Sequence, residues 1–587
     1  MTRVLNRAGL PFRFKVVNDP QGYTRCDAGV LYIARSDYPA VASALERIYS
    51  DLVEMLRPGV PALTKPLAPG LGLAEDPGTE DSFGMHRCGL LADALIRAHE
   101  QRKRSVESRL SVVAERFAEA GISLDEPFLN AGSRDEYSFQ PQPNPHMRSS
   151  GKTRPSVSGA TTYIGVAKDI GRRLVREAIW HEERCNWIGP ELATATTHEP
   201  GGTVYRALGP EIYAGTSGIA WFLAELAAIN GEVETRRTAL GAVRQALLRA
   251  DADPSVKTVG PYTGYMGIAL AAAHVGTLLN EAEPLERAAR LARQVLDGSQ
   301  GQYEHDLLSG TAGAIVAALI LCEKLDDSRM LERATRLGDA LLQTAVCSDA
   351  GMSWQSIAAR GQRNLTGFSH GAAGIGYALL ELFRATGVPA YRETAERAYQ
   401  YERYWFDATA GNWPDFRAAQ GERRHKRDLL KFAVSWCHGA PGITLSRLRA
   451  WTILGDERYK AEALIALRTT CVMIEKTLSA RTGNYSLCHG LAGNADILAH
   501  GEQVLGNEAS GGLEAARAVA DAGIAAHVER DIPWPCGTSA GETPSLMLGL
   551  AGIGHFYLRL HTPTVPSVLL CQIGVCCNCS GRGGKRE

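Results

Sequence analysis

Seven apolar runs with helical spacing recur through the last two-thirds of this 587-residue chain, and each begins at a pair of glycines. Runs such as IAWFLAELAAI and IGYALLELF follow these pairs directly, as in buried helices. The first glycines are Gly215, Gly264, Gly310, Gly371, Gly439, Gly490 and Gly549, so the step varies from 46 residues (264 to 310) to 68 (371 to 439). Such a repeat predicts one helical hairpin per copy, stacked into an array or closed into a ring. Glycine at the start of an inner helix lets backbones crowd near a common centre where a Cβ has no room.

The first 130 residues have a different pattern. The runs FRFKVV and GVLYIA are nearly continuous apolar stretches of strand length. The stretches YPAVASALERIYSDLVEML and HRCGLLADALIRAHEQRK have apolar residues three and four positions apart, as in amphipathic helices. Mixed strands and helices without βαβ regularity predict a small α+β domain over residues 1–130.

Composition separates the remaining segments. Residues 131–159 are polar and rich in proline and serine, which indicates a linker or loop. Residues 160–567 hold the glycine repeats and are expected to be mainly α. Residues 568–587 contain CQIGVCCNCSGRGGKRE, a cysteine-rich tail that we expect to be disordered unless it binds metal.

Overall composition is that of an ordinary globular protein and excludes several classes. The formal net charge of −1 gives no indication of nucleic-acid or membrane-surface binding. The apolar helices are interrupted by charged residues too early to span a membrane, and the start of the chain lacks the apolar core of a signal peptide. Thirteen cysteines in a chain of this size favour a reducing cytoplasm and thiols used for metal binding or catalysis.

Two repeats place cysteine and histidine at the same structural point. Cys437 precedes the fifth glycine pair, and Cys488 and His489 precede the sixth. Two thiolates and one imidazole are a known ligand set for catalytic zinc with an open position. Zinc there would lower the pKa of an incoming thiol, so that more of it is the attacking thiolate at neutral pH. The alternative is that these are buried structural cysteines, but the shared register and the adjacent histidine favour the metal site.

Histidines also recur one residue before the first glycine of a pair. His370, His438 and His489 share this position, which predicts a cluster of imidazoles at the centre. Asp306, in EHDLLSGTAG, lies upstream of the third pair and is placed to orient one of them. A single histidine near a helix start is more often a capping or core residue, but the repeat register favours function for His370 and His438.

The motifs SHGAAG, WCHGAPG and CHGLAG, with the terminal WPCGTSAGETPSLMLGLAGIGHFYLRL, resemble the LanC-like lanthionine cyclase family over residues 160–567. The resemblance implies an α/α toroid of seven inner and seven outer helices, with Zn²⁺ held by Cys437, Cys488 and His489. It implies that His370 and Asp306 line the site. His438 stands where many relatives carry tyrosine. Relatives often have a basic residue shortly before the WC, where this chain has Ala433 and Val434, with Lys431 further upstream.

The reaction implied by this family is the addition of a peptide cysteine thiolate to dehydroalanine or dehydrobutyrine, which forms a lanthionine or methyllanthionine ring. An imidazolium, with His370 preferred over His438, would protonate the resulting enolate. The implied partner is a ribosomal precursor peptide with a leader and a core of Ser, Thr and Cys. An alternative within the same fold is the addition of another thiol, such as glutathione.

Basic residues are concentrated in the N-terminal segment. Phosphate elimination needs cations to hold the phosphate, a base for the α-proton and an acid for the leaving group. The candidates for binding phosphate are Arg13, Lys15, Arg25 and Arg87, and the candidates for acid–base work are Lys65 and His86, with Lys15 a second possible base. The alternative is that these are ordinary solvated surface charges.

Residues 8–125 resemble the HopA group of bacterial type III effectors, and Arg13-Phe14-Lys15 is similar to a motif of phosphothreonine lyases. This resemblance implies a phosphoserine or phosphothreonine lyase fused to the cyclase. No kinase signature accompanies it, so phosphorylation would need a separate kinase subunit, as in a class V type lanthipeptide synthetase. The alternative is that the N-terminal domain only binds the kinase and the precursor peptide.

Overall fold

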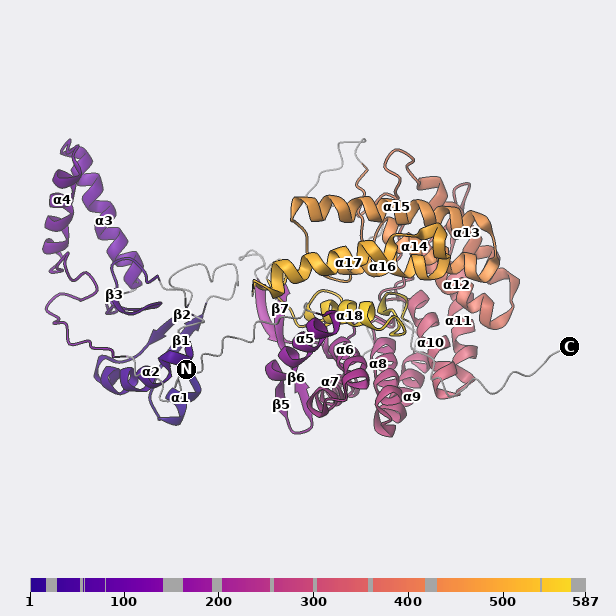
Figure 1. The fold of residues 1–587 in the computed structure, drawn as a ribbon, viewed down its shortest axis with the longest axis horizontal. Coiled ribbons are helices and arrows are strands. Elements are labelled where there is room, and N and C mark those ends of the chain that lie inside the picture. Colours follow the sequence, from indigo (N-terminus) through magenta and orange to yellow (C-terminus); the bar gives the residue numbers. More distant parts are fainter. Residues whose placement is uncertain are drawn as a thin grey trace. The chain divides into compact units, whose positions relative to one another are not determined.

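The computed structural model describes residues 2–16, 29–52, 56, 59–79, 81–140, 162–192, 203–253, 258–298, 303–356, 363–417, 430–530, 532–538 and 541–571. The chain forms two compact units, residues 1–158 and residues 159–587. Figure 1 shows their elements. Among the described residues, no helix is long and apolar enough to cross a membrane.

The N-terminal unit is a small α+β domain, as the sequence pattern predicts. Its helices are α1 (Thr2–Arg7), α2 (Tyr38–Leu52), α3 (Phe83–Glu100) and α4 (Val106–Glu119), with the short 3-10 turn η2 (Arg35–Asp37) before α2. Its strands are β1 (Arg13–Val16), which pairs antiparallel with β2 (Gly29–Tyr32), and β3 (Lys65–Ala68), which pairs antiparallel with β4 (Leu71–Leu73). Ser82 and Ser105 cap the N-termini of α3 and α4 with their side chains, which fixes where this helical hairpin begins.

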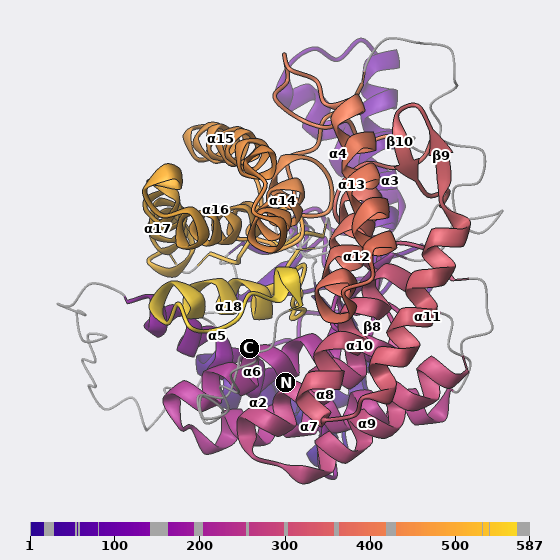
Figure 2. The ribbon, with the colours of Figure 1, turned by 90° about the vertical axis from the view of Figure 1, so that its right-hand side faces the viewer.

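The second unit is an α/α toroid. Its inner helices are α6 (Thr216–Asn230), α8 (Tyr265–Leu279), α10 (Thr311–Leu325), α12 (Ala372–Thr386), α14 (Ala440–Leu454), α16 (Leu491–Leu505) and α18 (Leu550–His561). Its outer helices are α5 (Tyr163–Glu177), α7 (Val233–Ala252), α9 (Ala282–Asp297), α11 (Arg329–Thr344), α13 (Pro389–Trp405), α15 (Glu457–Ala480) and α17 (Gly512–Gly523). Each inner helix packs on its two inner neighbours, and α18 packs on both α6 and α5, which closes the ring (Figure 2).

The first glycine of each pair is the N-cap residue of an inner helix in all seven repeats. A Cβ on Gly439 would lie 1.8 Å from the carbonyl oxygen of Ala433, and one on Gly549 would lie 1.9 Å from that of Thr543. At these first glycines, the atoms that leave no room for a Cβ belong to the loop that precedes the same helix. The sequence pattern predicts, in contrast, that they belong to the backbone of another repeat. At the second glycine of several pairs, a Cβ would overlap both the preceding loop of the same repeat and a residue of a neighbouring repeat. A Cβ on Gly442, for example, would be 2.2 Å from its own loop and 2.5 Å from Phe368 of the preceding repeat.

Backbone hydrogen bonds join the entry loops into a chain around the centre. Tyr213 N–H donates to Tyr262 O (2.8 Å), Tyr262 to Leu308 O (3.2 Å), Leu308 to Ser369 O (3.1 Å) and Ser369 to Cys437 O (3.2 Å). On the other side, Cys488 N–H donates to Met547 O (3.0 Å), and Met547 N–H donates to Tyr213 O (2.9 Å). Between the loops of Cys437 and Cys488, both of which are described, there is no such bond. This gap is where two thiols meet.

A second periodic feature lies ten residues after the first glycine of each pair. These positions hold Glu225, His274, Ile320, Glu381, Arg449, His500 and Arg559. Six of the seven are polar, although they lie on inner helices that are otherwise buried and apolar. They pair around the ring: Glu225 with His274 at 2.8 Å, Glu381 with Arg449, and Arg559 with Asp496 at 3.0 Å. Buried charges are retained when each has such a partner.

The end of the described chain fills the ring near this polar belt. Val568–Leu570 form the 3-10 turn η6, and Val568, Leu569, Leu570 and Cys571 are all at most 4% exposed. Tyr262 OH donates to Val568 O (2.8 Å), and Trp436 Nε1 donates to Leu569 O (3.0 Å). Residues 568–571, which the sequence pattern placed in the disordered tail, are therefore part of the ring core because their apolar side chains are buried. The other tail cysteines lie outside the described residues.

Several short elements do not follow from the sequence pattern. Three antiparallel hairpins lie beside the ring: β5 (Ile179–His181) with β6 (Arg184–Asn186), β7 (Ile188–Leu192) with β8 (Thr203–Ala207), and β9 (Val346–Ser348) with β10 (Gly351–Ser353). The segment HEERCN (181–186) forms the turn and the second strand of the first hairpin. The predicted linker begins later than residue 131, because Tyr137 is buried in the N-terminal unit and Tyr38 OH donates to Ser138 O. Residues 141–161 lie outside the described part.

Candidate active site at the ring centre

Cys437 and Cys488 face each other across the gap in the backbone chain. The Cys488 thiol donates a hydrogen bond to the Cys437 sulfur, and this bond lowers the pKa of Cys437 to about 6. The same bond holds the pKa of Cys488 well above its usual value. Tyr213 OH in turn donates to Cys488 Sγ at 3.0 Å, and Ser435 Oγ lies 3.3 Å from Cys437 Sγ. The arrangement favours one thiolate in a pair of sulfurs that come from repeats 51 residues apart (437 to 488).

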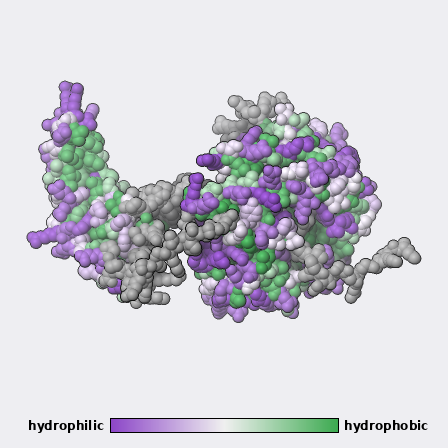
Figure 3. Space-filling view, viewed as in Figure 1, coloured by the Kyte–Doolittle hydropathy of each residue, from purple (hydrophilic) through white to green (hydrophobic). Residues whose placement is uncertain are grey.

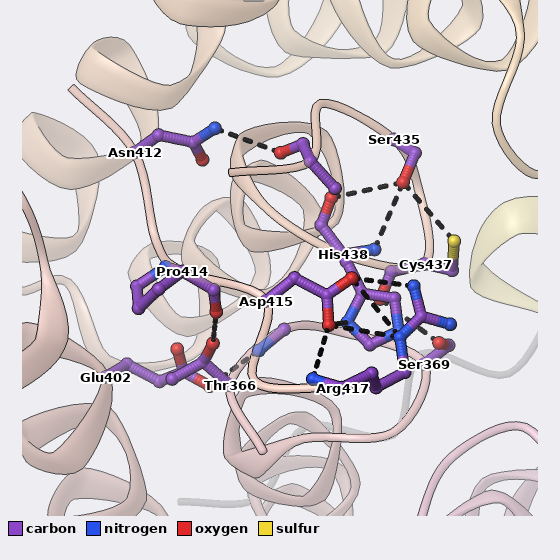
Figure 4. Close-up of polar contacts among 12 residues, drawn as sticks. Thr366, Ser369, Glu402, Asn412, Pro414, Asp415, Arg417, Ser435, Cys437 and His438 are labelled. Atoms are coloured by element: carbon purple, nitrogen blue, oxygen red, sulfur yellow. Dashed lines mark hydrogen bonds and ion pairs between the residues drawn. The ribbon is translucent and has the colours of Figure 1, made fainter. Parts of the chain in front are cut away.

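Side chains from neighbouring elements anchor the loop that carries Cys437. Asn412 donates from Nδ2 to Ala433 O (2.9 Å) and accepts from Ala440 N–H (2.8 Å), so it holds both ends of the loop (Figure 4). Asn494 of α16 donates to Val434 O at 3.0 Å. Gly439 has a φ of +87°, a conformation that glycine adopts without strain. The sulfur is therefore positioned by a loop with little freedom to move.

His489 follows Cys488 directly in the sequence, but its imidazole ring contacts a backbone carbonyl and not the two sulfurs. Its Nε2 is 3.1 Å from the carbonyl oxygen of Gly537, where a Cβ would come within 2.9 Å of the ring. Within the described residues, no three His, Cys, Asp or Glu side chains are grouped closely enough to hold a metal ion. The donor types still fit zinc, since two thiols and a neighbouring imidazole are a known ligand set. The two sulfurs of Cys437 and Cys488 are hydrogen-bonded to each other, whereas His489, the third of the three residues, contacts the carbonyl oxygen of Gly537.

His370 and Asp306 form a charged hydrogen-bonded pair beside this site. His370 Nδ1 lies 2.6 Å from Asp306 Oδ2, while Asp306 Oδ1 accepts from Ser309 N–H (2.8 Å) and Ser309 Oγ (3.0 Å). Burial lowers the pKa of His370, but the hydrogen bond and charge of Asp306 outweigh burial and raise it overall. An Nδ1–H held by a carboxylate leaves Nε2 for the reacting group, the usual arrangement of an oriented histidine.

The buried Glu402 fixes the loop that carries His370. Its Oε1 accepts from Gly367 N–H (3.0 Å) and from Ala373 N–H (2.8 Å), one at each side of the histidine. Burial raises the pKa of this carboxyl to about 7. Glu402 lies on the outer helix α13, so an outer helix positions an inner-loop histidine.

His438 stacks against His370, with ring centroids 5.6 Å apart. It is 1% exposed, neither ring nitrogen has a hydrogen-bond partner within the described part of the chain, and Asp415 Oδ1 lies 3.8 Å from its Nδ1. Burial lowers the pKa of His438, and the charge of Arg417 lowers it further. His438 is therefore a neutral imidazole, whereas Asp306 favours the protonated form of His370.

Asp415 and Arg417 complete the site, and sequence reasoning missed both. Arg417 donates to Asp415 from Nε (3.0 Å) and Nη2 (2.7 Å), as Figure 4 shows, and its charge acts on both thiols and both stacked histidines. Backbone pairing of Asp415 N–H with Lys431 O (2.7 Å) holds their segment. Lys431 itself is exposed, so the cation at this site is Arg417. The only sequence signal is an Asp-x-Arg triplet outside the glycine register.

In the N-terminal unit, two of the predicted catalytic or phosphate-binding residues have structural contacts. Arg87 is fully buried and donates to the carbonyl oxygens of Pro127 (2.8 Å) and Leu129 (2.9 Å). It therefore ties down a loop and is not placed to bind phosphate. Lys65 Nζ is paired with the Asp135 carboxylate and donates to Tyr137 O at 2.7 Å. Lys65 is the first residue of β3, and its ammonium has an anionic partner.

The remaining N-terminal candidates have weaker contacts. His86 Nδ1 lies 2.7 Å from Arg87 Nη1, at the start of α3. Arg13 and Lys15 are exposed on β1, and Arg13 lies 5.3 Å from the centroid of the Tyr32 ring. Arg25 lies outside the described residues. The described contacts do not bring these side chains into one site.

Comparisons with known proteins bear on both units. Residues 1–129 match the HopA1 effector protein family, and residues 206–570, more than half of the chain, match the family described as lanthionine synthetase C-like protein. The chain is 25% identical over 293 residues to the glutathione S-transferase LANCL1 of Danio rerio, which covers 48% of this chain and 67% of that protein.

Two further similarities involve lanthipeptide proteins. The chain is 24% identical over 141 residues to the lacticin 481/lactococcin biosynthesis protein LcnDR2 of Lactococcus lactis subsp. lactis, covering 23% of this chain and 14% of that protein. Among solved structures, nisin cyclase matches with 16% identity and a TM-score of 0.46, covering 62% of this chain and 92% of the cyclase. This chain belongs to the lanthionine synthetase C-like family and carries a HopA1-type domain at its N-terminus.

Proposed function

We propose that the ring catalyses thioether formation in a ribosomal precursor peptide, by adding a cysteine thiol to dehydroalanine or dehydrobutyrine. The observation that carries the proposal is the convergence of a thiol pair, an Asp-oriented protonated histidine and a fixed guanidinium on one point of the ring. These three groups match the three requirements of the reaction: a site for a thiolate, a proton donor and a cation for the developing negative charge.

The reaction adds S–H across a carbon–carbon double bond. The substrate thiol releases its proton to water, from which His370 regains a proton after the reaction. The substrate sulfur attacks the β-carbon, and the π electrons move toward the carbonyl to give an enolate. His370, held by Asp306, gives its proton to the α-carbon, which restores the carbonyl. Arg417, held by Asp415, stabilises the enolate oxygen while the charge is present. The neutral His438 packs against His370 and limits how its ring can turn.

We further propose that Cys437, Cys488 and His489 bind Zn²⁺. Bound zinc would lower the pKa of the substrate thiol, so that it enters the reaction as thiolate. The shared proton of the thiol pair supports this proposal, because one sulfur is already biased toward the anionic form that binds metal. His489 would have to exchange its contact with Gly537 O for the metal.

A second candidate is the addition of glutathione or another free thiol in place of a peptide cysteine. Its support is the similarity to a protein named as a glutathione S-transferase. Both candidates use the same residues and differ only in the thiol. Mass spectrometry of a dehydrated peptide, incubated with and without glutathione, separates them: internal rings leave the peptide mass unchanged, whereas glutathione adducts increase it.

For the N-terminal unit, the contacts of Lys65 and Arg87 favour the binding alternative over phosphate elimination. A general base needs an unprotonated nitrogen, which the Asp135 carboxylate disfavours at Lys65, and a phosphate ligand needs N–H groups that are not already engaged. Both Lys65 and Arg87 instead donate to the segment that follows α4. We therefore propose that this unit binds the precursor peptide or a separate kinase subunit. Phosphate elimination by His86, Arg13, Lys15 and Arg25 stays a prediction.

Replacing either thiol should remove the metal without unfolding the ring. We expect Cys437→Ala and Cys488→Ala to lose about one equivalent of zinc and to stop ring closure, because two remaining donors cannot hold a catalytic ion. Cys322→Ala on α10, a partly buried cysteine outside the site, is the matched control. Zinc is measured by elemental analysis of purified protein. A Cys437 or Cys488 variant with the parent zinc content would show that the metal assignment is wrong.

The pH dependence of cyclisation should report on His370. A general acid is active when protonated, so the rate should fall as pH rises through the pKa of His370, which Asp306 raises. Besides Asp306, the groups that act on this ring are Cys437, Arg417 and His438. Asp306→Asn should move the falling limb to lower pH, and His370→Asn should slow cyclisation by roughly 10²-fold or more at all pH values. An unchanged pH profile in Asp306→Asn would contradict this role.

Arg417→Gln should lower the cyclisation rate by roughly 10²–10³-fold, since it removes a charge that acts in the transition state. Thermal unfolding checks that this variant stays folded, because it leaves the Asp415 carboxylate without its guanidinium partner. The chain offers a matched control. Arg458 binds Asp456 through the same Asp-x-Arg geometry, with Nε at 3.0 Å and Nη2 at 2.6 Å from Oδ2, but it is an exposed residue at the start of α15. Arg458→Gln should keep the parent rate. Equal rates for the two variants would exclude a catalytic role for Arg417.

Lys65→Ala should weaken the fold of the N-terminal unit and leave chemistry on a phosphorylated precursor unchanged. Losing the ammonium leaves the Asp135 carboxylate unpaired, which costs free energy in this partly buried site. The measurements are the unfolding temperature and the loss of phosphate from a phosphopeptide, read by mass spectrometry. A variant that folds normally but accumulates phosphorylated peptide would restore the lyase interpretation.

A further inference from the structure

The α3–α4 hairpin of the N-terminal unit leaves large apolar side chains in solvent. On α3, Met85 is 65% exposed, Leu95 45% and Ile96 60%; on α4, Val106 is 76% exposed and Leu110 55%. We call these five residues the apolar face of the hairpin. They are not the side chains that join the two helices, because Leu90, Ala94, Val113 and Phe117 are buried between them. Figure 3 shows apolar surface along this hairpin.

The spacing of the exposed residues is that of a helix-packing surface. On α4, Val106, Leu110, Ala114 and Ala118 are exposed one turn apart. On α3, the small residues Gly89 and Ala92 are exposed between the larger ones. Small residues between large ones form grooves that accept the ridges of another helix. Large apolar side chains left in solvent at this spacing on both helices of a hairpin are typical of an interaction surface.

Charge at the two ends of the hairpin is opposite in sign. The tip carries four exposed cations (Arg102, Lys103, Arg104 and Arg109) against two exposed carboxylates (Glu100 and Glu107). The base carries five exposed carboxylates, Asp81, Glu115, Glu119, Asp125 and Glu126. Of these, Glu119 is paired with Arg97 at 2.8 Å and lies 3.9 Å from Arg116, and the other four leave the base net acidic. A second hairpin lying antiparallel on the first would place each tip against the base of the other. The surface is therefore complementary to itself.

We propose that two copies of this chain associate through the apolar faces of their α3–α4 hairpins, antiparallel and related by a two-fold axis, to form a four-helix interface. A two-fold interface uses the same patch on both subunits, so that patch must be complementary to itself. The basic tip and acidic base of the hairpin satisfy this condition. The apolar faces supply the burial, and the end charges set the orientation. This inference does not depend on the reaction proposed for the ring.

The first test compares two valines in the same helical position. Val106 and Val233 are each the first residue of a helix, α4 and α7, and are 76% and 75% exposed. We expect the full-length parent to sediment as a dimer, Val106→Asp and Leu110→Asp to weaken dimerisation at least tenfold, and Val233→Asp to have no effect. Aspartate in the first turn suits a helix N-terminus equally in both valine variants, so their difference reports on the surface.

The second test uses charge reversal and does not depend on apolar substitutions. One variant changes the tip (Arg102, Lys103 and Arg104 to Glu), and the other changes the base (Glu115, Asp125 and Glu126 to Lys). Each alone brings like charges together twice in the antiparallel dimer and should be monomeric. An equimolar mixture pairs opposite charges at both ends, so it should form mixed dimers. Circular dichroism and thermal unfolding check that each variant is folded.

The proposal is overturned if the parent is monomeric at the highest concentration measured, if Val106→Asp dimerises as the parent does, or if the two charge variants do not combine. Dimers that persist with the apolar face altered would show that another surface joins the copies. A monomeric parent would mean that the apolar face of the hairpin binds something other than a second copy of the chain. Dimers that dissociate in both Val106→Asp and Val233→Asp would point to a general effect of added charge and would also contradict the proposal.

Discussion

Close contact between backbones at the ring centre is the constraint on which the site depends. The first glycine of each pair lets the entry loop press against the helix that follows, at distances where a Cβ would overlap a carbonyl oxygen. The loops then lie near enough to bond to one another, copy after copy, through backbone groups. The chain of bonds is interrupted between Cys437 and Cys488, and there the sulfurs meet. The rigid frame on both sides holds the reactive pair without a disulfide or a flexible arm.

The frame also separates the charges that the proposed chemistry needs. The buried carboxylate of Asp306 favours the protonated form of His370, and the partly buried carboxylate of Asp415 holds Arg417. His438 lies between them without a hydrogen-bond partner and is neutral. His370 is therefore hydrogen-bonded to Asp306 and Arg417 to Asp415, so each of the two has a carboxylate partner other than the thiol pair. Positioning by Glu402 and Asn412, which reach the loops from outside the inner ring, shows that outer elements contribute to the geometry of the centre.

The inner helices also carry a second repeated feature, a polar residue at the same position in six of the seven repeats. Four of the polar residues ten positions after the first glycine form two pairs, Glu225 with His274 and Glu381 with Arg449. The turn at Val568–Leu570 accepts a hydrogen bond from Trp436, the neighbour of Cys437. The N-terminal unit is built differently. Two of its predicted catalytic or phosphate-binding residues, Lys65 and Arg87, hold its own loops together, and its α3–α4 hairpin exposes large apolar side chains.

The sequence alone determined the repeat, the mainly α ring and the small α+β unit, because apolar periodicity and glycine spacing are local properties that each repeat expresses independently. It also selected Cys437, Cys488 and His370, which stand at the same point of different repeats. It did not reveal Arg417 and Asp415, the burial of Val568–Cys571, or the pairing of Lys65 with Asp135. These depend on contacts between residues that lie outside the register or far apart in the chain. Only closure of the ring and packing of each unit bring such residues together, so tertiary structure decided them.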